Sequence, residues 1–302
     1  MSKSQSRAKL EYALYRVITG LVCLVPLRIL QWGGSMVGVL FFLVHKRRRI
    51  VLGNLSLIYP DQSPRWRSRL GMRCARHFGR ILFDLIKLSR MSRERLMTLL
   101  PIEGLDHLEE SLKMGKGAFV LSGHLGNWEM AAQAMALRGV NQEMVYRPLD
   151  NPYLDRELRD MRTRFGNRLI PKKGAIRGML TALGENRVID ILIDQYVSPE
   201  LGVSAPFLGH PAPTTASLAQ IVLKTGAPVL PLISYPEGKG YKTEIHSPVP
   251  VEEGDDAESL TVRYNEIISE MIKNRPHTWL WFHDRWGIRK SPRNAESGEA
   301  EG

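Results

Sequence analysis

Residues 118–137 read AFVLSGHLGNWEMAAQAMAL and contain a change from strand-like to helix-like composition. The first five residues are apolar and typical of a buried strand, whereas WEMAAQAMAL at 128–137 is typical of a helix. Between these two segments, Gly123 and Gly126 permit a tight turn that would expose the imidazole of His124. Sites in open α/β sheets form beyond the carboxyl ends of the strands. The stretch therefore predicts a functional turn at the end of a strand.

Short apolar runs continue to alternate with helix-like stretches on the C-terminal side of this turn. Strands are expected at 143–146, 188–193 and 227–234, with an edge strand at 242–246. Helices are expected at 152–165, 176–183, 214–224 and 258–273. Such an alternation is typical of an α/β domain. We therefore predict the α/β fold class, a mostly parallel sheet flanked by helices, over residues 51–290, followed by a disordered tail at 291–302.

The N-terminal segment is apolar and ends in a basic run. Residues 17–27 and 29–44 are uncharged, Arg28 separates them, and HKRRR follows at 45–49. Together the apolar residues are long enough to cross a bilayer, for which about 20 residues suffice. The central Arg28 equally favours two shorter helices that only dip into the membrane, and a buried helical pair in a soluble core is the alternative. We predict that residues 1–50 anchor the chain to a membrane, with the basic run on anionic headgroups.

Positive charge is concentrated in the first third of the chain. The whole sequence holds 42 Lys and Arg against 31 Asp and Glu, whereas residues 1–100 hold 19 basic and 4 acidic side chains. Residues 65–95 have the pattern of a basic amphipathic helix, which suits a membrane surface, although a solvated arginine face is the alternative. This imbalance favours a polyanionic partner: an anionic membrane surface, an acidic carrier protein or nucleic acid. Nucleic acid is the least favoured, because the sequence has no nucleic-acid-binding motif.

His124 and Glu129 are candidates for acid–base chemistry. On one continuous helix, five residues apart, they would point about 140° apart. With His124 in the turn and Glu129 in the first helical turn, the carboxylate can reach back to the ring and accept the Nδ1 proton. The Nε2 atom would then be free to take a proton from a hydroxyl. A purely structural histidine is the alternative.

Several other chemistries lack their motifs. The sequence has no Gly-x-Ser-x-Gly elbow and no Gly-x-x-x-x-Gly-Lys-[Ser/Thr] loop, which disfavours a serine hydrolase and a nucleotide hydrolase. Only two cysteines are present, Cys23 and Cys74, which excludes a disulfide scaffold and a multi-cysteine zinc site. A mean hydropathy of −0.19 excludes a protein with many membrane spans.

Six blocks of sequence carry a family signature. In chain order they are NL with YP at 54–60, HLGNWE at 124–129, VYRP with NP at 145–152, DQ at 194–195, FLG with PAPTT and APVLP at 207–231, and WFHDRW at 281–286. These blocks, in this order, resemble those of the bacterial lipid A late (secondary) acyltransferases, within the lysophospholipid acyltransferase-like superfamily. The resemblance spans residues 10–288.

The resemblance implies a glycerolipid acyltransferase-like fold and an O-acyltransferase of the lauroyl or myristoyl type. The donor would be an acyl thioester, acyl carrier protein or acyl-CoA, and the acceptor a hydroxyl of a membrane lipid, expected to be a lipid A precursor. The alternatives are a lysophospholipid or a glycolipid of the phosphatidylinositol mannoside type as acceptor, or a non-catalytic lipid-binding scaffold. Neither a metal nor a cofactor is required. The chain is expected on the cytoplasmic face of the inner membrane, as a single N-terminal span or peripherally bound.

The resemblance also implies the roles of individual residues. His124, as general base, and Glu129 form the catalytic pair, and the substrate-binding candidates are Asn127, Arg147, Asp194, Gln195 and Arg285. Asp194 could orient the site or bind a substrate hydroxyl, and Arg147 could clamp a phosphate or form a structural ion pair. The oxyanion is expected to meet backbone N–H groups near Gly123 or Gly126, or the side chain of Arg147.

Overall fold

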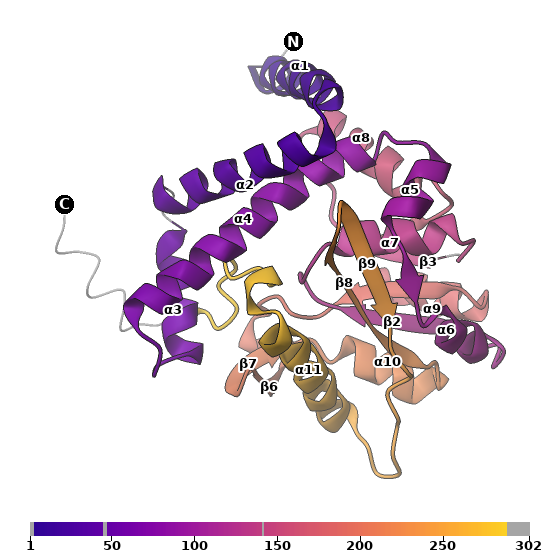
Figure 1. Ribbon diagram of the computed structural model, residues 1–302. Coiled ribbons are helices and arrows are strands. Elements are labelled where there is room, and N and C mark those ends of the chain that lie inside the picture. Colours follow the sequence, from indigo (N-terminus) through magenta and orange to yellow (C-terminus); the bar gives the residue numbers. More distant parts are fainter. Residues whose placement is uncertain (1–2, 45–46, 141, 289–302) are drawn as a thin grey trace.

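The computed structural model describes residues 3–44, 47–140 and 142–288, and the predicted tail at 291–302 lies outside these residues. Its centre is a seven-stranded sheet of order β1-β9-β8-β2-β5-β3-β4 (Figure 1). The strands are β1 (Ile102–Glu103), β2 (Ala118–Ser122), β3 (Gln142–Tyr146), β4 (Arg168–Pro171), β5 (Val188–Leu192), β8 (Val229–Glu237) and β9 (Gly240–Ile245). Among these described strands every pairing is parallel except that of β8 with β9. The predicted α/β class with a mostly parallel sheet is therefore confirmed.

The strand prediction was wrong at one place, and it missed a hairpin at another. β9 is not an edge strand, because the short β1 pairs with its outer side. The stretch at 203–214 forms a separate antiparallel hairpin of β6 (Val203–Phe207) and β7 (His210–Thr214). Prolines recur in both strands of this hairpin, and proline is confined to edge strands because it has no N–H to donate. Helix α10 (Ser217–Thr225) consequently begins three residues later than expected.

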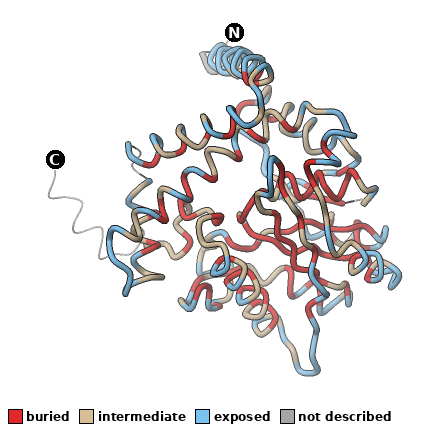
Figure 2. The backbone as a smooth tube through the Cα atoms, viewed as in Figure 1, coloured by how far each residue is buried: buried red, intermediate tan, exposed pale blue. Residues whose placement is uncertain are grey.

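The central strands are buried because helices cover both faces of the sheet. All five residues of β2 are buried, and so are four of the five in β5, as expected for parallel strands covered on both sides. Figure 2 shows this buried centre surrounded by helices with exposed outer faces. The helices that follow β1 in sequence are α6 (Leu105–Leu112), α7 (Trp128–Leu137), α8 (Pro152–Thr163), α9 (Ala175–Gly184), α10 and α11 (Ala257–Asn274), with short turns η1 (Pro199–Leu201) and η2 (Pro276–Thr278).

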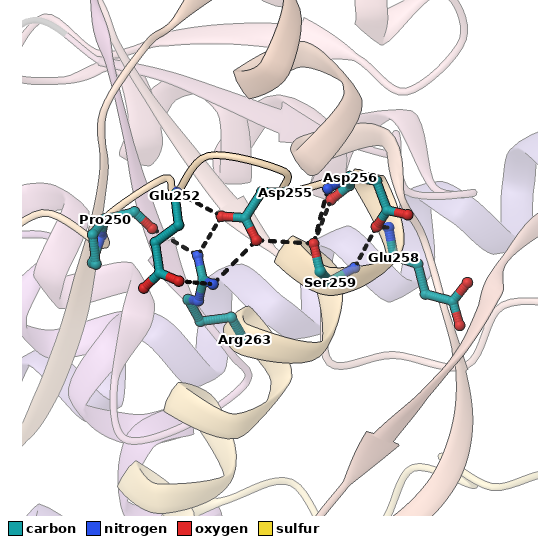
Figure 3. A network of polar contacts seen from close by, with 7 residues as sticks. All are labelled: Pro250, Glu252, Asp255, Asp256, Glu258, Ser259 and Arg263. Atoms are coloured by element: carbon teal, nitrogen blue, oxygen red, sulfur yellow. Dashed lines mark hydrogen bonds and ion pairs between the residues drawn. The ribbon is translucent and has the colours of Figure 1, made fainter.

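Helix α11 begins at a polar cap that the sequence sets up locally (Figure 3). The Asp256 side chain accepts hydrogen bonds from the backbone of Glu258 and Ser259, and the Ser259 hydroxyl accepts one from the Asp256 N–H, which completes a capping box. Arg263, two turns further on, makes a two-pronged ion pair with Asp255. Such caps satisfy N–H groups that a helix leaves without partners at its start.

The N-terminal residues form a layer of helices rather than one continuous span. They are α1 (Lys3–Leu24), α2 (Leu27–Val44), α3 (Arg48–Ile58), α4 (Pro64–Leu88) and α5 (Arg93–Leu99). Helix α4 begins at Ser63 and Pro64 as predicted, with the Ser63 side chain capping the backbone of Trp66. Figure 1 shows α2 lying alongside α4. By length and composition, α2 is the one described helix that could cross a membrane.

Glycines bring α2 and α4 into close contact. A Cβ atom on Gly38 would lie 2.0 Å from the backbone oxygen of Ala75, and one on Gly79 would lie 2.2 Å from that of Gly34. No side chain larger than hydrogen fits at these crossings, so the two helices pack backbone to backbone. The contact ties the apolar α2 to the rest of the protein along its length.

Candidate active site

The register of the sheet places His124 beside Asp194. Strands β2 and β5 are paired in parallel, with Ser122 opposite Leu192. Each candidate side chain follows its strand by two residues, so both lie at the carboxyl-end edge of the sheet. The imidazole Nδ1 is 2.8 Å from Asp194 Oδ1. The two residues are 70 positions apart in sequence, and the paired strands alone bring them together.

Asp194 is a buried carboxylate with a full set of hydrogen-bond donors. Its Oδ2 accepts from the backbone N–H of His124 at 2.7 Å and from the indole N–H of Trp279 at 2.8 Å, and its side chain is 2% exposed. Burial opposes ionisation and is the largest single influence on this carboxyl. The charge of His124 and the three hydrogen bonds together outweigh burial, so the pKa of Asp194 lies below its usual range. Asp194 therefore stays charged and orients the ring.

The other ring nitrogen of His124 faces an exposed amide. The Nε2 atom is 3.0 Å from the amide nitrogen of Gln195, which donates, so the hydrogen-bond network assigns the ring proton to Nδ1 and leaves Nε2 as the acceptor. Burial, the largest influence, disfavours charge on the ring, but the attraction and hydrogen bond of Asp194 outweigh it and raise the pKa of His124 above 6.5. This is the tautomer and the basicity that a general base requires.

The predicted hydrogen bond between Glu129 and the imidazole was wrong. Glu129 lies in the first turn of α7, where its carboxylate makes a two-pronged ion pair with Arg162 of α8, with one contact of 3.0 Å. The Nδ1 proton of His124 goes to Asp194 instead, because β5 presents that carboxylate directly opposite the turn. Glu129 still acts on the ring at a distance, since its charge favours the protonated imidazole.

A second carboxyl group lies buried near Glu129. Asp190 points from the middle of β5 and its Oδ1 atom has no hydrogen-bond partner among the described residues. Burial and the neighbouring charge of Glu129 raise the pKa of Asp190 to about 7, against the opposing charge of Arg162. Near neutral pH this carboxyl is therefore only partly charged, unlike an ordinary aspartate.

The backbone of the turn is held by the segment near the C-terminus. The Gly126 N–H donates to the oxygen of Thr278 at 2.9 Å, and the Leu280 N–H donates to that of His124 at 3.0 Å. The Asn127 N–H also donates, to the backbone oxygen of Ser234 at 2.9 Å. Among the expected oxyanion donors near Gly123 or Gly126, the Gly126 N–H therefore already has an acceptor within the protein.

The remaining candidates divide between the interior and the surface. Asn127 is fully buried and caps α7 through the backbone N–H of Met130. Arg285, 0% exposed, donates to the oxygen of Pro213 and to the hydroxyl of Thr214, which are β7 residues. These contacts give both residues structural roles, and their assignment to substrate stays a prediction. Arg147 and Gln195 are exposed at the edge of the sheet where His124 lies.

Trp279, which was not among the sequence-predicted site residues, also takes part in the site. Its ring is buried, in contact with Trp281 and Phe207, but its N–H donates to Asp194. The only sequence signal was its closeness to the WFHDRW block. His283 in that block accepts from the backbone N–H of Tyr196 at 2.8 Å, so it supports the strand end that carries Asp194.

Replacing Gly126 by alanine is expected to lower the free energy of unfolding by about 3 kcal/mol or more. Gly126 has φ +63°, and a Cβ atom there would lie 1.5 Å from the backbone oxygen of Ser234. Gly139→Ala is the matched control, because Gly139 has φ +81° but nothing within 4 Å of a Cβ. It should cost only about 1–2 kcal/mol. Denaturant unfolding of the two variants checks this, and equal losses would contradict it.

Comparison with known proteins gives a consistent picture. The model of the family described as bacterial lipid A biosynthesis acyltransferase matches residues 1–287. The chain is 26% identical to the lipid A biosynthesis lauroyltransferase of Escherichia coli, over 89% of both chains. It is 27% identical to a phosphatidylinositol mannoside acyltransferase of Mycobacterium tuberculosis, over 69% of this chain and 67% of that one. The crystal structure of the 1-acyl-sn-glycerophosphate acyltransferase PlsC from Thermotoga maritima aligns with 80% of this chain and 97% of its own, at 18% identity and a TM-score of 0.39.

Proposed function

The chain belongs to the family of bacterial lipid A biosynthesis acyltransferases, and we propose that it moves a fatty acyl chain from an acyl thioester to a hydroxyl of a lipid A precursor. The observation that carries this proposal is the His124–Asp194 pair, with Nε2 of the imidazole at the exposed side of the site. An acyl carrier protein or acyl-CoA supplies the thioester. The family establishes an acyltransferase that acts on lipids, and the donor, the acceptor and the roles of the residues are our proposals.

The geometry suggests one order of proton transfers. Nε2 of His124 takes the proton of the acceptor hydroxyl while the hydroxyl oxygen attacks the thioester carbonyl carbon. Asp194 stabilises the imidazolium that forms. The tetrahedral intermediate then expels the thiolate as the carbon–sulfur bond breaks, and Nε2–H returns the proton to the sulfur. Gln195 must release Nε2 when the hydroxyl arrives, which leaves its amide N–H available to the oxyanion.

The proposal is tested by assaying the purified protein with one acyl thioester against a panel of acceptors. A lipid A precursor should be acylated faster than a lysophospholipid or a phosphatidylinositol mannoside. The second candidate acceptor is the mannoside, because relatives of that name match over two thirds of the chain. Faster acylation of the phosphatidylinositol mannoside would contradict a lipid A precursor as the acceptor and support the mannoside instead. Absence of transfer with every donor and acceptor would instead support a non-catalytic lipid-binding protein.

We also propose that the enzyme is bound to the cytoplasmic face of the inner membrane through α1 and α2, at the surface of one leaflet. Large apolar side chains are exposed along both helices: Leu10, Leu14, Val17, Ile18, Leu21 and Leu24 in α1, and Ile29, Trp32, Val37, Leu40, Phe41, Leu43 and Val44 in α2. An apolar surface of this extent is typical of a membrane contact. The opposite side of α2 is occupied by α4, which disfavours a span that crosses the bilayer apart from the protein.

A buried polar contact supports the same arrangement. The amide of Gln31 in α2 donates to both oxygens of Asp84 in α4, at 2.9 and 3.1 Å, and to the backbone oxygen of Lys239 at 3.0 Å. Tyr241 of β9 donates to the same carboxylate at 2.6 Å. Because Lys239 and Tyr241 belong to the α/β domain, this contact holds the start of α2 against that domain and leaves its other face for lipid.

Two glutamates on the exposed apolar faces are expected to weaken membrane binding. The Leu14→Glu/Leu40→Glu variant places one charge on each helix and should lower the partition into vesicles of anionic lipid at least about tenfold, since each buried leucine contributes about 1.5–3 kcal/mol. Leu201→Glu/Val251→Glu is the matched control, with equally exposed side chains outside these helices. Co-sedimentation measures both variants. Equal retention of the two would contradict a membrane contact through α1 and α2.

The rate should depend on pH through His124. A general base must be neutral, and the pKa of His124 is raised above 6.5, so kcat/KM should fall as the pH drops through that raised value and level out above it. On the acidic limb of the pH profile, kcat/KM should fall by nearly tenfold per pH unit. Rates measured in neutral detergent micelles between about pH 5 and 9 test this. An acidic midpoint below 6.5 would contradict the assigned base.

A further inference from the structure

Asp190 is a buried carboxyl group that the proposed proton transfers do not use. It lies in the middle of β5, opposite Val120 of β2 and Met144 of β3, neither of which titrates. Paired residues of neighbouring strands point to the same face of a sheet, and so do residues two apart along one strand. Val120 and Val188 pack in one apolar cluster with Ala131 of α7. Asp190 therefore points toward α7, inside the protein.

The groups on this side of the sheet leave Asp190 poorly compensated. Glu129 in the first turn of α7 is a second carboxylate, and the guanidinium of Arg162 in α8 makes both of its carboxylate contacts with Glu129. The Oδ1 atom of Asp190 has no hydrogen-bond partner among the described residues. A buried carboxyl group that no donor meets favours its protonated form. Two buried acids beside one paired guanidinium thus explain why Asp190 ionises far less readily than an ordinary aspartate.

Asp190 also acts on the imidazole. Burial opposes charge on the ring of His124, whereas Asp194, Glu129 and Asp190, in decreasing order, favour it. The imidazolium in turn favours the charged form of Asp190, against burial and the charge of Glu129. Charges interact more strongly in the interior of a protein than in water. The protonation of His124 and that of Asp190 therefore depend on each other.

We propose that Asp190 is a positioning residue for acyl transfer, and that its charged form stabilises the imidazolium of His124 together with Asp194. This inference rests on the proposed function and adds to it a second ionisation that governs the rate. Asp190 exchanges its proton with solvent and forms no bond with the substrate. While Asp190 is protonated, Nε2 still acts as a base, but one negative charge fewer faces the imidazolium. The enzyme therefore has a slower form at low pH and a faster form at higher pH.

The test removes this charge in two ways, by Asp190→Asn, which keeps the shape of the side chain, and by Asp190→Leu. With saturating substrates in neutral detergent micelles, both variants should have a plateau of kcat above about pH 8 that is roughly three- to tenfold lower than that of the unaltered protein. The KM values should change less than about twofold. At about pH 5.5 the rates should converge, because Asp190 is then protonated in the unaltered protein as well.

The matched control is Asp84→Asn, which changes another buried aspartate. Burial raises the pKa of Asp84 too, but its carboxylate accepts hydrogen bonds from Gln31 and Tyr241, away from the imidazole. Per folded molecule, Asp84→Asn should keep the plateau of kcat at high pH. Loss of the plateau in this control as well would assign the effect to weakened packing and overturn the role of Asp190.

A second measurement needs no turnover. The titration of His124 is followed by NMR of the protein with labelled histidine rings, and the resonance is assigned by its absence in His124→Ala. In Asp190→Asn the ring of His124 should lose its proton at a lower pH than in the unaltered protein or in Asp84→Asn. This titration decides whether Asp190 acts on the imidazole even if no donor and acceptor pair supports acyl transfer.

Stability gives an independent sign. The pKa of Asp190 is raised to about 7 in the folded protein, so the free energy of unfolding loses stability from this group as the pH rises from about 4 to 7. Asp190→Asn lacks this loss and should gain stability relative to the unaltered protein across that window. The proposal is overturned if Asp190→Asn keeps the plateau of kcat and the titration of His124, or if its rate falls by one constant factor at every pH.

Discussion

Replacing His124 by alanine is expected to lower the rate of acyl transfer by roughly 10²–10⁴, the contribution that a positioned general base makes. In the structure, Nε2 is the basic atom at the exposed side of the site, and Asp194 assigns the ring proton to Nδ1. Without the imidazole, the acceptor hydroxyl must give its proton to water. The rate constants of purified His124→Ala, measured with a saturating thioester, check this expectation.

The matched control for this variant is His246→Ala. His246 is exposed, follows β9, and its backbone rather than its ring takes part in the sheet. It should keep the full rate. His124→Ala should also fold, because its ring is at the edge of the core with its side chain 21% exposed. Retention of more than a few per cent of the wild-type rate, about 5% or above, would remove His124 from the proposed role.

Local patterns predicted the elements whose signals lie within a few residues. The apolar run of β2, the Ser63–Pro64 start of α4 and the helical spacing in α11 each depend on neighbouring side chains, and the structure confirms them. The β6–β7 hairpin was missed because its prolines break both strand and helix patterns. The pairing of β1 with β9 joins residues about 140 positions apart, so no local pattern could predict it.

The site shows the same limit more sharply. The spacing of His124 and Glu129 favoured a contact between neighbours along the chain. In the structure Glu129 pairs with Arg162 instead, and the register of β2 with β5 places Asp194 next to the imidazole. The strand-end position of Asp194 could be predicted from sequence, whereas its partner depended on which strands are neighbours. The Trp279 hydrogen bond joins segments 85 residues apart, and its detection required the folded chain.

Replacing Asp194 by asparagine is expected to lower the rate by roughly 10²–10⁴ and to shift the acidic limb of the pH profile. The carboxylate is the main influence that raises the pKa of His124 against burial. Asparagine removes that charge, so the ring should lose its proton at a lower pH and the limb should move to lower pH. The NH₂ group of the new amide would also face a hydrogen-bond donor, either the indole N–H of Trp279 or the backbone N–H of His124, which both now donate to Asp194.

A second buried aspartate separates this effect from a general loss of stability. Asp84, 0% exposed, accepts hydrogen bonds from Gln31, Arg80 and Tyr241, away from the imidazole. Asp84→Asn should therefore destabilise the fold by about 1–3 kcal/mol, as Asp194→Asn should, but per folded molecule it should leave the acidic limb in place. Both variants are compared by denaturant unfolding and by kcat/KM across the pH range. An unshifted limb in Asp194→Asn would mean that this carboxylate serves the fold alone, and that the basicity of His124 has another source.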